Sequence, residues 1–497
     1  MIFIGIDSGT QSTKAIALNS ETGEIMASAQ ETYDLIEGLP NGHMEQHPQD
    51  WIDATKKVIA RCVSDLGELS KKIKGIGVSG QQHGLVVLDE FDKVIRPAKL
   101  WCDTSTVDQC NQFAEEFGGA SGLLDIAGNN IMPGYTVPKI LWIKQNEPDN
   151  YKRIRTILLP HDYINFYLTG QKKMEYGDAS GTGILNVRTR EWCQELIEFV
   201  DPSMLDALPP LQSSLALNGE VRPEVLKECG LPDGVIVSAG GGDNMMGAIG
   251  TGNIKSGVIT ASFGTSGTLY GVSDFPAIDK SGEVAAFCDS ADKWLPLVCT
   301  MNVTVVTEQI RQMFSYNLQD LESAVTDTKP GADGILFLPY LTGERTPNLP
   351  QGKGLVHGLN CNNMEPAKLA RAAMEGATMG LAYGLNKFRE MGINPSEIRI
   401  TGGGSKSPAW RQIAADIFSA SVVPLSTSEG ASLGAAIQVI NCYESSDTNN
   451  YEELCNKFVE LDEQNRCEPI KENISLYKGL LEEHTKLTSD LNRLGYI

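Results

Sequence analysis

The sequence predicts an α/β protein with two related domains on either side of a cleft, and three features favour this fold. Its 497 residues exceed what one hydrophobic core usually supports, so two domains of roughly 200 to 250 residues are expected. Short apolar runs alternate with amphipathic stretches of helical spacing, which is typical of α/β proteins. A similar glycine-rich segment opens each half of the chain.

The two similar segments read Asp-Ser-Gly-Thr-Gln-Ser-Thr at 7–13 and Ser-Phe-Gly-Thr-Ser-Gly-Thr at 262–268. Each lies between two apolar runs, so each predicts a β-hairpin with the segment at its turn. The runs are residues 1–6 and 14–18 in the first half, and residues 258–261 and 269–272 in the second. Such turns present backbone N–H groups and hydroxyls, and glycine lets phosphate oxygens approach closely. The pair therefore predicts a nucleotide held in the cleft between two domains.

Further elements follow each hairpin in a similar order. The first half predicts a helix over 51–69, a strand over 73–78 and a strand over 234–238. The second half predicts, in chain order, a strand over 335–338, a helix over 366–388, a strand over 398–401 and a helix over 408–419. We expect a first domain over 1–250, a second over 251–442, and a polar tail over 443–497 with one or two surface helices.

Charge and cysteine usage limit the classes of partner. A formal net charge of -22 argues against nucleic acid or an anionic membrane as partner, because both reward clustered Lys and Arg. The 11 cysteines stand singly without a Cys-x-x-Cys pair, which indicates reduced thiols in a cytoplasmic protein. The N-terminus lacks a basic region, so no signal peptide is expected, and no apolar run reaches bilayer length. A monomer or a homodimer is expected.

Two aspartates stand where chemistry is expected, each with a structural alternative. Asp243 follows the strand over 234–238 and three glycines. It is a candidate general base, and it could equally cap the next helix. Asp7 ends the first strand beside the first loop, where a carboxylate can hold Mg²⁺ through water or stabilise its own turn.

A third glycine-rich segment, Gly402-Gly403-Gly404, follows the strand over 398–401 and precedes a helix. An adenosine could pass close to this backbone, with its phosphates near the start of the helix. A triple glycine by itself is more often only a loop.

Eight motifs in order carry a resemblance to a known family. They are 5–10 (GIDSGT), 80–84 (GQQHG), 100–103 (LWCD), 138–142 (PKILW), 178–182 (DASGT), 241–244 (GGDN), 339–347 (PYLTGERTP) and 402–405 (GGGS). In this order they resemble the FGGY carbohydrate kinases of the actin-like ATPase superfamily, most of all the members that phosphorylate xylulose. The resemblance implies two ribonuclease-H-like domains flanking a catalytic cleft, with sugar on the N-terminal side and ATP mainly on the C-terminal side.

The resemblance also implies a reaction and its residues. ATP, as co-substrate with Mg²⁺, would phosphorylate a ketopentose, with D-xylulose to D-xylulose 5-phosphate as the expected reaction. Asp243 would be the general base, and Asp7 the second catalytic residue, holding Mg²⁺ through water. The implied sugar-binding residues are Gln81, Gln82, His83, Trp101, Asp103, Asp243 and Asn244. The implied ATP-binding residues are Gly9, Thr10, Gln11, Ser12, Thr13, Gly264, Thr265, Gly402, Gly403, Gly404 and Ser405.

Several positions depart from the family pattern and leave the exact sugar open. Ser105 stands where many members carry arginine, Gln82 where methionine is frequent, and Met245 and Met246 where small residues are common. The alternatives are a kinase for another sugar or polyol, such as ribulose or glycerol, and a non-catalytic actin-like ATP-binding protein. A degenerate kinase that senses sugar is a further alternative.

Overall fold

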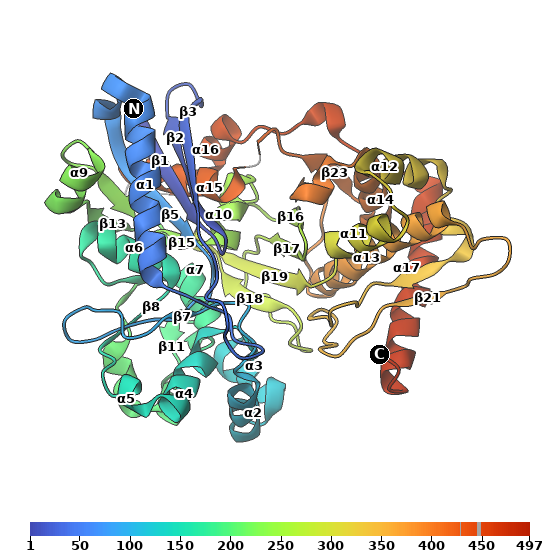
Figure 1. The fold of residues 1–497 in the computed structure, drawn as a ribbon, viewed down its shortest axis with the longest axis horizontal. Helices are drawn as coiled ribbons and strands as arrows, with labels where there is room; N and C mark the ends of the chain where they lie inside the picture. Colours follow the sequence, from blue (N-terminus) through green and yellow to red (C-terminus); the bar gives the residue numbers. More distant parts are fainter. Residues whose placement is uncertain (428, 445–448) are drawn as a thin grey trace.

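The computed structural model describes residues 1–427, 429–444 and 449–497, and its core consists of two β-sheets with helices packed on them (Figure 1). The first sheet has the order β13-β14-β5-β1-β2-β3, and β15 also pairs with β5. Its strands are β1 (Ile2–Ser8), β2 (Ser12–Asn19), β3 (Ile25–Thr32), β5 (Ile73–Gly80), β13 (Leu217–Glu220), β14 (Ile236–Ser238) and β15 (Gly241–Gly242). The second sheet has the order β18-β19-β17-β16-β22-β23. Its strands are β16 (Val258–Phe263), β17 (Gly267–Gly271), β18 (Ala285–Cys288), β19 (Trp294–Thr300), β22 (Glu397–Thr401) and β23 (Ser421–Pro424).

The two sheets share one topology. In the first, β1 pairs antiparallel with β2 and parallel with β5, and β5 pairs parallel with β14. In the second, β16 pairs antiparallel with β17 and parallel with β22, and β22 pairs parallel with β23. Both predicted hairpins and the internal repeat are therefore confirmed. The strand over 335–338 also forms, as β20 (Leu336–Leu338), but it pairs with β21 (Leu355–His357) outside the second sheet.

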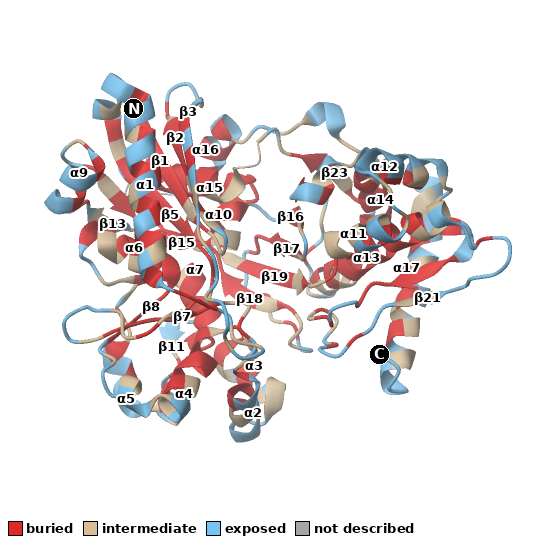
Figure 2. Ribbon diagram, in the orientation of Figure 1, coloured by how far each residue is buried: buried red, intermediate tan, exposed pale blue. Residues whose placement is uncertain are grey.

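Helices cover the apolar faces of both sheets. α1 (Pro48–Leu66) lies against β2 and β3, and its buried residues recur at helical spacing, as the sequence predicts. α13 (Pro366–Glu390) and α14 (Pro408–Phe418) belong to the core of the second sheet. Figure 2 shows that the strands at the centre of each sheet are buried and that the outer face of α1 is exposed.

Two helices that cross closely connect the halves of the molecule. α10 (Asp243–Gly250) packs against α15 (Gly430–Glu444), and α15 packs on β1 and β5 of the first sheet, although it comes from the range expected for the second domain. Glycines permit this approach, since a Cβ added at Gly5 would lie 1.9 Å from the carbonyl oxygen of Ser432, and one at Gly434 would lie 1.8 Å from that of Met246.

The tail forms helices, as expected. α16 (Tyr451–Phe458) packs on α15, and α17 (Lys471–Arg493) packs on α13 and α14. α17 is not only a surface helix, because its Tyr477 and Leu481 are buried in the core of the second sheet. Among the described residues, no helix combines the length and apolar character that crossing a membrane requires.

Candidate active site

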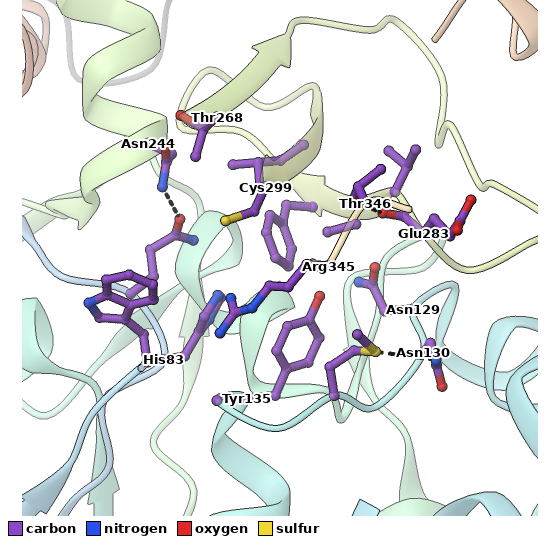
Figure 3. A pocket seen from close by; sticks show the side chains of 18 of the residues that line it. His83, Asn129, Asn130, Tyr135, Asn244, Thr268, Glu283, Cys299, Arg345 and Thr346 are labelled. Carbon is purple, nitrogen blue, oxygen red and sulfur yellow. Dashed lines mark hydrogen bonds between the residues drawn. The ribbon is translucent and has the colours of Figure 1, made fainter. Parts of the chain in front are cut away.

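A cavity of about 280 Å³ lies between the two halves of the molecule and is lined by both (Figure 3). Polar and aromatic side chains dominate its wall, as is usual where a small polar ligand binds. The first half contributes Gln82, His83, Trp101, Asn129, Asn130, Tyr135, Asp243 and Asn244. The second half contributes Ser262, Ser266, Thr268, Glu283, Phe287, Cys299, Arg345 and Thr346.

Asp243 is the first residue of α10, directly after β15. The helix N-cap is Gly242, so the alternative in which Asp243 is only the cap does not describe the structure. One carboxylate oxygen of Asp243 accepts hydrogen bonds from the backbone N–H of Asn244 at 2.9 Å and from its side-chain amide at 3.1 Å. Burial, together with the negative charges of Asp7 and Asp178, raises the pKa of Asp243 to about 8.

Gln82, His83 and Asn244 lie on the same wall of the cavity. The amide of Asn244 donates to the carbonyl oxygen of Gln82 at 2.8 Å (Figure 3). His83 has a positive φ of 62°, and its ring lies 5.0 Å from that of Tyr135 and 5.4 Å from that of Phe287. Burial lowers the pKa of His83 well below its ordinary value, so the imidazole is neutral and can donate one hydrogen bond and accept another.

Trp101 separates this cavity from a second hollow and lines both. Its indole N–H donates to the hydroxyl of Thr10 at 3.0 Å, which fixes the ring beside the first loop. The guanidinium carbon of Arg345, from the second half, lies 5.7 Å from the centroid of the Trp101 ring. Arg345 points toward His83 and Tyr135 (Figure 3), so it brings a positive charge across the cleft.

Asp7 lies in the second hollow, which faces the first loop and the start of α15. The hollow is lined by Asp7, Gly9, Thr10, Gln11, Ser12, Lys14, Trp101, Glu429, Gly430, Ala431 and Ser432. Asp7 accepts a hydrogen bond from Ser79 at 2.8 Å, and burial raises its pKa, with the charge of Glu429 adding to the effect. Lys14 lies 3.9 Å from Glu429. Two carboxylates beside an open hollow form a donor set that suits hydrated Mg²⁺.

The first loop divides into residues that face the hollow and residues that support them. Gly9, Thr10, Gln11 and Ser12 line the hollow. Thr13 is buried, and its hydroxyl donates to that of Ser8. Gln81 is buried too: it accepts from Thr10 and donates to Gln46 at 3.0 Å. Thr13 and Gln81 line neither cavity nor hollow.

The third glycine segment lies beside the second loop because β22 pairs with β16. The φ of Gly402 is 84°, and a Cβ there would lie 2.7 Å from the carbonyl of Phe263 and 3.1 Å from the nitrogen of Gly264. Gly403 has open space around it, and the hydroxyl of Ser405 donates to the carbonyl of Gly402 at 2.7 Å. The carbonyls of Gly264 and Thr265 accept from the start of α11 (Thr304–Met313) and from Val303, so the loop tip is held in place.

Asp103 lies apart from the cavity. It is fully buried and accepts from the ammonium group of Lys99 at 3.1 Å and from the hydroxyl of Ser105 at 2.6 Å. His43, Glu45 and Asp103 are close enough to share a cation. The ammonium of Lys99 already lies 3.2 Å from both Glu45 and His43, so it supplies that positive charge.

Several residues that line the cavity or the hollow were not among the site residues predicted from the sequence. Tyr135, Asn130, Phe287 and Cys299 come from segments far apart in the chain, and no local pattern marks them. Arg345 had a signal, because it lies in the motif over 339–347 that carries part of the family resemblance. Glu429 had a signal, namely an acidic residue followed by the small residues Gly430, Ala431 and Ser432 at the start of a helix.

Comparison with known proteins agrees with this geometry. The FGGY family of carbohydrate kinases matches with its N-terminal domain over residues 2–250 and its C-terminal domain over residues 260–440. The xylulose kinase of Haemophilus influenzae is 41% identical and covers 99% of this chain and 100% of its own length. That of Bacillus subtilis is 36% identical and covers 98% of this chain and 97% of its own length. The crystal structure of ligand-bound xylulose kinase from Lactobacillus acidophilus superposes with a TM-score of 0.91 at 26% identity, over 99% of this chain and 98% of that one.

Proposed function

The chain belongs to the FGGY family of carbohydrate kinases, and we propose that it transfers the γ-phosphoryl group of ATP to the terminal hydroxyl of D-xylulose, giving D-xylulose 5-phosphate. The observation that carries this proposal is Asp243, a carboxylate that lines the small polar cavity and lies close enough to Asp7, in the neighbouring hollow, for their charges to interact. The near full-length similarity to two xylulose kinases selects the sugar.

Asp243 is proposed as the general base. Its carboxylate would take the proton of the sugar hydroxyl, whose oxygen then bonds to the γ-phosphorus while the bond to the leaving ADP oxygen breaks. With a pKa of about 8, Asp243 is mostly protonated in the free protein at neutral pH. The two hydrogen bonds from Asn244 and the positive end of the α10 dipole favour its ionised form.

The sugar is proposed to bind in the cavity beside Asp243. The neutral imidazole of His83 and the amides of Gln82 and Asn244 offer both donors and acceptors to its hydroxyls. The ring of Trp101 would cover its C–H face, and Arg345 would add donors from the opposite half. Gln81 and Asp103 would act from behind this wall, because both are buried away from the cavity.

ATP is proposed to span the two loops. Gly9, Thr10, Gln11 and Ser12 would contact its phosphates from the first half, with Thr13 supporting the loop from below. Gly264 and Thr265 would contact them from the second half. The adenosine would lie along Gly402, Gly403, Gly404 and Ser405, where Gly403 leaves open space.

Asp7 and Glu429 would hold Mg²⁺, Asp7 through water, since carboxylate oxygens and water are the ligands that Mg²⁺ prefers. Bound Mg²⁺ would neutralise negative charge on the phosphates and favour the ionised form of Asp243.

The free thiols of all 11 cysteines support a reducing compartment such as the cytoplasm. A monomer or a homodimer stays a prediction.

The test is ADP release with Mg·ATP, measured by a coupled assay. The panel is D-xylulose, L-xylulose, D-ribulose, L-ribulose, glycerol and xylitol, with a blank that lacks sugar. We expect a large rise with D-xylulose. A rise in ADP release with a different sugar would support kinase activity and identify that sugar as the substrate. Rates equal to the blank for every sugar would contradict the proposed function.

A further inference from the structure

A histidine between two aspartates lies buried behind the proposed sugar site. His161 stands at the start of α6 (Pro160–Thr169), and its Nδ1 is hydrogen-bonded to Asp178 at 3.0 Å. Its Nε2 lies 3.0 Å from Asp162, an ion-pair contact outside hydrogen-bond geometry. All three side chains are at most 2% exposed. The two carboxylates outweigh the effect of burial and raise the pKa of His161 well above its ordinary value, so it is an imidazolium. Burial raises the pKa of Asp178, and the imidazolium opposes that rise. Glu175, at the start of α7 (Tyr176–Ala179), is the other acidic group near this imidazolium.

Asp178 faces the sugar site through Gln82. The Oδ1 of Asp178 and the Nε2 of Gln82 are both buried, and neither makes a hydrogen bond within the described part of the chain, so a buried acceptor and a buried donor both stand unsatisfied behind the cavity. Gln82 lies close enough to oppose the rise that burial causes in the pKa of Asp178, as expected if its amide N–H groups turn toward that carboxylate. The other end of the same amide, Oε1, accepts from Asn244 at 2.8 Å.

The sequence of side chains from Asp178 through Gln82 to Asn244 determines which end of each amide faces its neighbour. An ionised carboxylate only accepts hydrogen bonds, so Gln82 must turn its NH₂ to Asp178 and its oxygen to Asn244. Asn244 must then present its NH₂ to Gln82 and to Asp243, from which it lies 3.1 Å. The carbonyl oxygen of Asn244 is left to accept from a ligand hydroxyl in the cavity.

We infer that Asp162, His161, Asp178 and Gln82 form a relay that orients Asn244, with its carbonyl oxygen toward a sugar hydroxyl. His161 and Asp178 are positioning residues, since neither lines the cavity. The relay makes this wall of the cavity an acceptor for a hydroxyl of a polyol. The inference rests on the proposed function for the identity of the sugar.

The test reverses the polarity of one hydrogen bond. Gln82→Glu places a second carboxylate against Asp178, so we expect the KM for D-xylulose to rise about a hundredfold, with the KM for ATP within about twofold of wild type. Asp178→Asn alone removes the fixed acceptor, and we expect the KM for D-xylulose to rise about tenfold. In the double variant Q82E/D178N the introduced amide can donate to the introduced carboxylate, and the KM should return to within about fivefold of D178N alone.

The double variant separates the relay from a general packing role. If the fold-changes in the KM for D-xylulose caused by Q82E and by D178N simply multiply in the double variant, the relay is overturned, because substitutions at independent sites do not rescue each other. A D178N variant with the wild-type KM would overturn it too. His484→Gln is the matched control, since His484 is another buried histidine, with a lowered pKa, on α17 far along the chain. It should lower the melting temperature and leave the KM for sugar unchanged.

Two further measurements cover the remaining outcomes. If D178N does not fold, Q82E must raise the KM at least tenfold more than Gln82→Met, which adds no charge, and equal values would overturn the relay. If wild type turns over another sugar of the panel, the KM of that sugar is used. If the wild-type protein phosphorylates no sugar, the proposed function fails. The relay is then tested by melting temperature: Q82E should lower it, and the double variant Q82E/D178N should restore it.

Discussion

Replacing Asp243 by Asn should abolish turnover and stabilise the fold at the same time. An amide of the same shape can still accept the hydrogen bond from the backbone of Asn244, so α10 should begin as before. It cannot take a proton from the sugar hydroxyl, so kcat should fall about 10²- to 10⁴-fold. Loss through misfolding would instead lower both activity and stability.

The stability gain follows from the pKa of Asp243. A folded-state pKa of about 8, against an ordinary 3.8, means that the folded protein holds this proton more tightly than the unfolded chain. The protonated carboxyl therefore favours folding at low pH, and that stability is lost as pH rises from about 4 to about 8. At pH 7 the loss has an upper limit of about 4 kcal/mol. Asp243 is only partly buried, because one side faces the cavity, so we expect about 1 to 2 kcal/mol.

The assay pairs coupled ADP release with thermal unfolding at pH 5.5 and pH 8.5. D243N should melt a few degrees above wild type at pH 8.5, with a smaller difference at pH 5.5. Asp289→Asn is the matched control, since burial raises the pKa of Asp289 to about 6 and its carboxylate accepts from two backbone N–H groups. D289N should keep wild-type kcat. A D243N enzyme with more than a tenth of wild-type kcat, or with a lower melting temperature at pH 8.5, would refute this reasoning.

Three other predictions concern the nucleotide side, the indole between the two hollows and the tail. Gly402→Val should weaken ATP binding at least tenfold in an equilibrium titration, because its Cβ would overlap Phe263 and its φ of 84° is strained; unchanged affinity would contradict the nucleotide assignment. Trp101→Phe removes the hydrogen bond to Thr10 and should raise the KM for both substrates about threefold to tenfold; an effect on neither would show that the ring does not couple the hollows. Arg371 and Glu375 on α13 form an ion pair at 2.6 Å, and both side chains hydrogen-bond the hydroxyl of Tyr477 on α17. Arg371→Leu leaves Glu375 without this ion pair and should destabilise the fold by about 3 to 5 kcal/mol in urea; a smaller loss would show that this pair does not anchor α17.

Local patterns predicted the hairpins and most helices because hydrophobic periodicity and glycine-rich turns act over a few residues. The repeat of residues 7–13 at 262–268 reappears as two sheets of one topology. Such local patterns could not predict how strands far apart in the sequence pair with each other. No local signal places Gly402 against Gly264, because that contact depends on β22 pairing with β16 across more than a hundred residues.

The proposed site shows the same division. Asp7, Asp243 and the first loop follow directly from strand ends, and the structure places them around adjoining hollows. Asp103 has a suitable chemistry and a neighbouring tryptophan, but its charge is taken up by Lys99 at 3.1 Å. Arg345 reaches the cavity only because the chain returns to it from the second half. Residue type predicted which side chains could act, and tertiary packing decided which of them face the cleft.

The two crossing helices explain why the proposed base and the proposed metal site can act together. Asp243 begins α10, and Glu429 directly precedes α15. A Cβ at Gly250 would lie 1.6 Å from the carbonyl oxygen of Gly430, so the helices touch through their backbones and leave no room to slide independently. Because α10 and α15 both pack on the first sheet, a movement of the second sheet toward the first would carry Arg345 and the second loop toward the first loop while Asp243, Asp7 and Glu429 keep their mutual geometry. Such a movement would exclude water around reacting groups whose arrangement is already set.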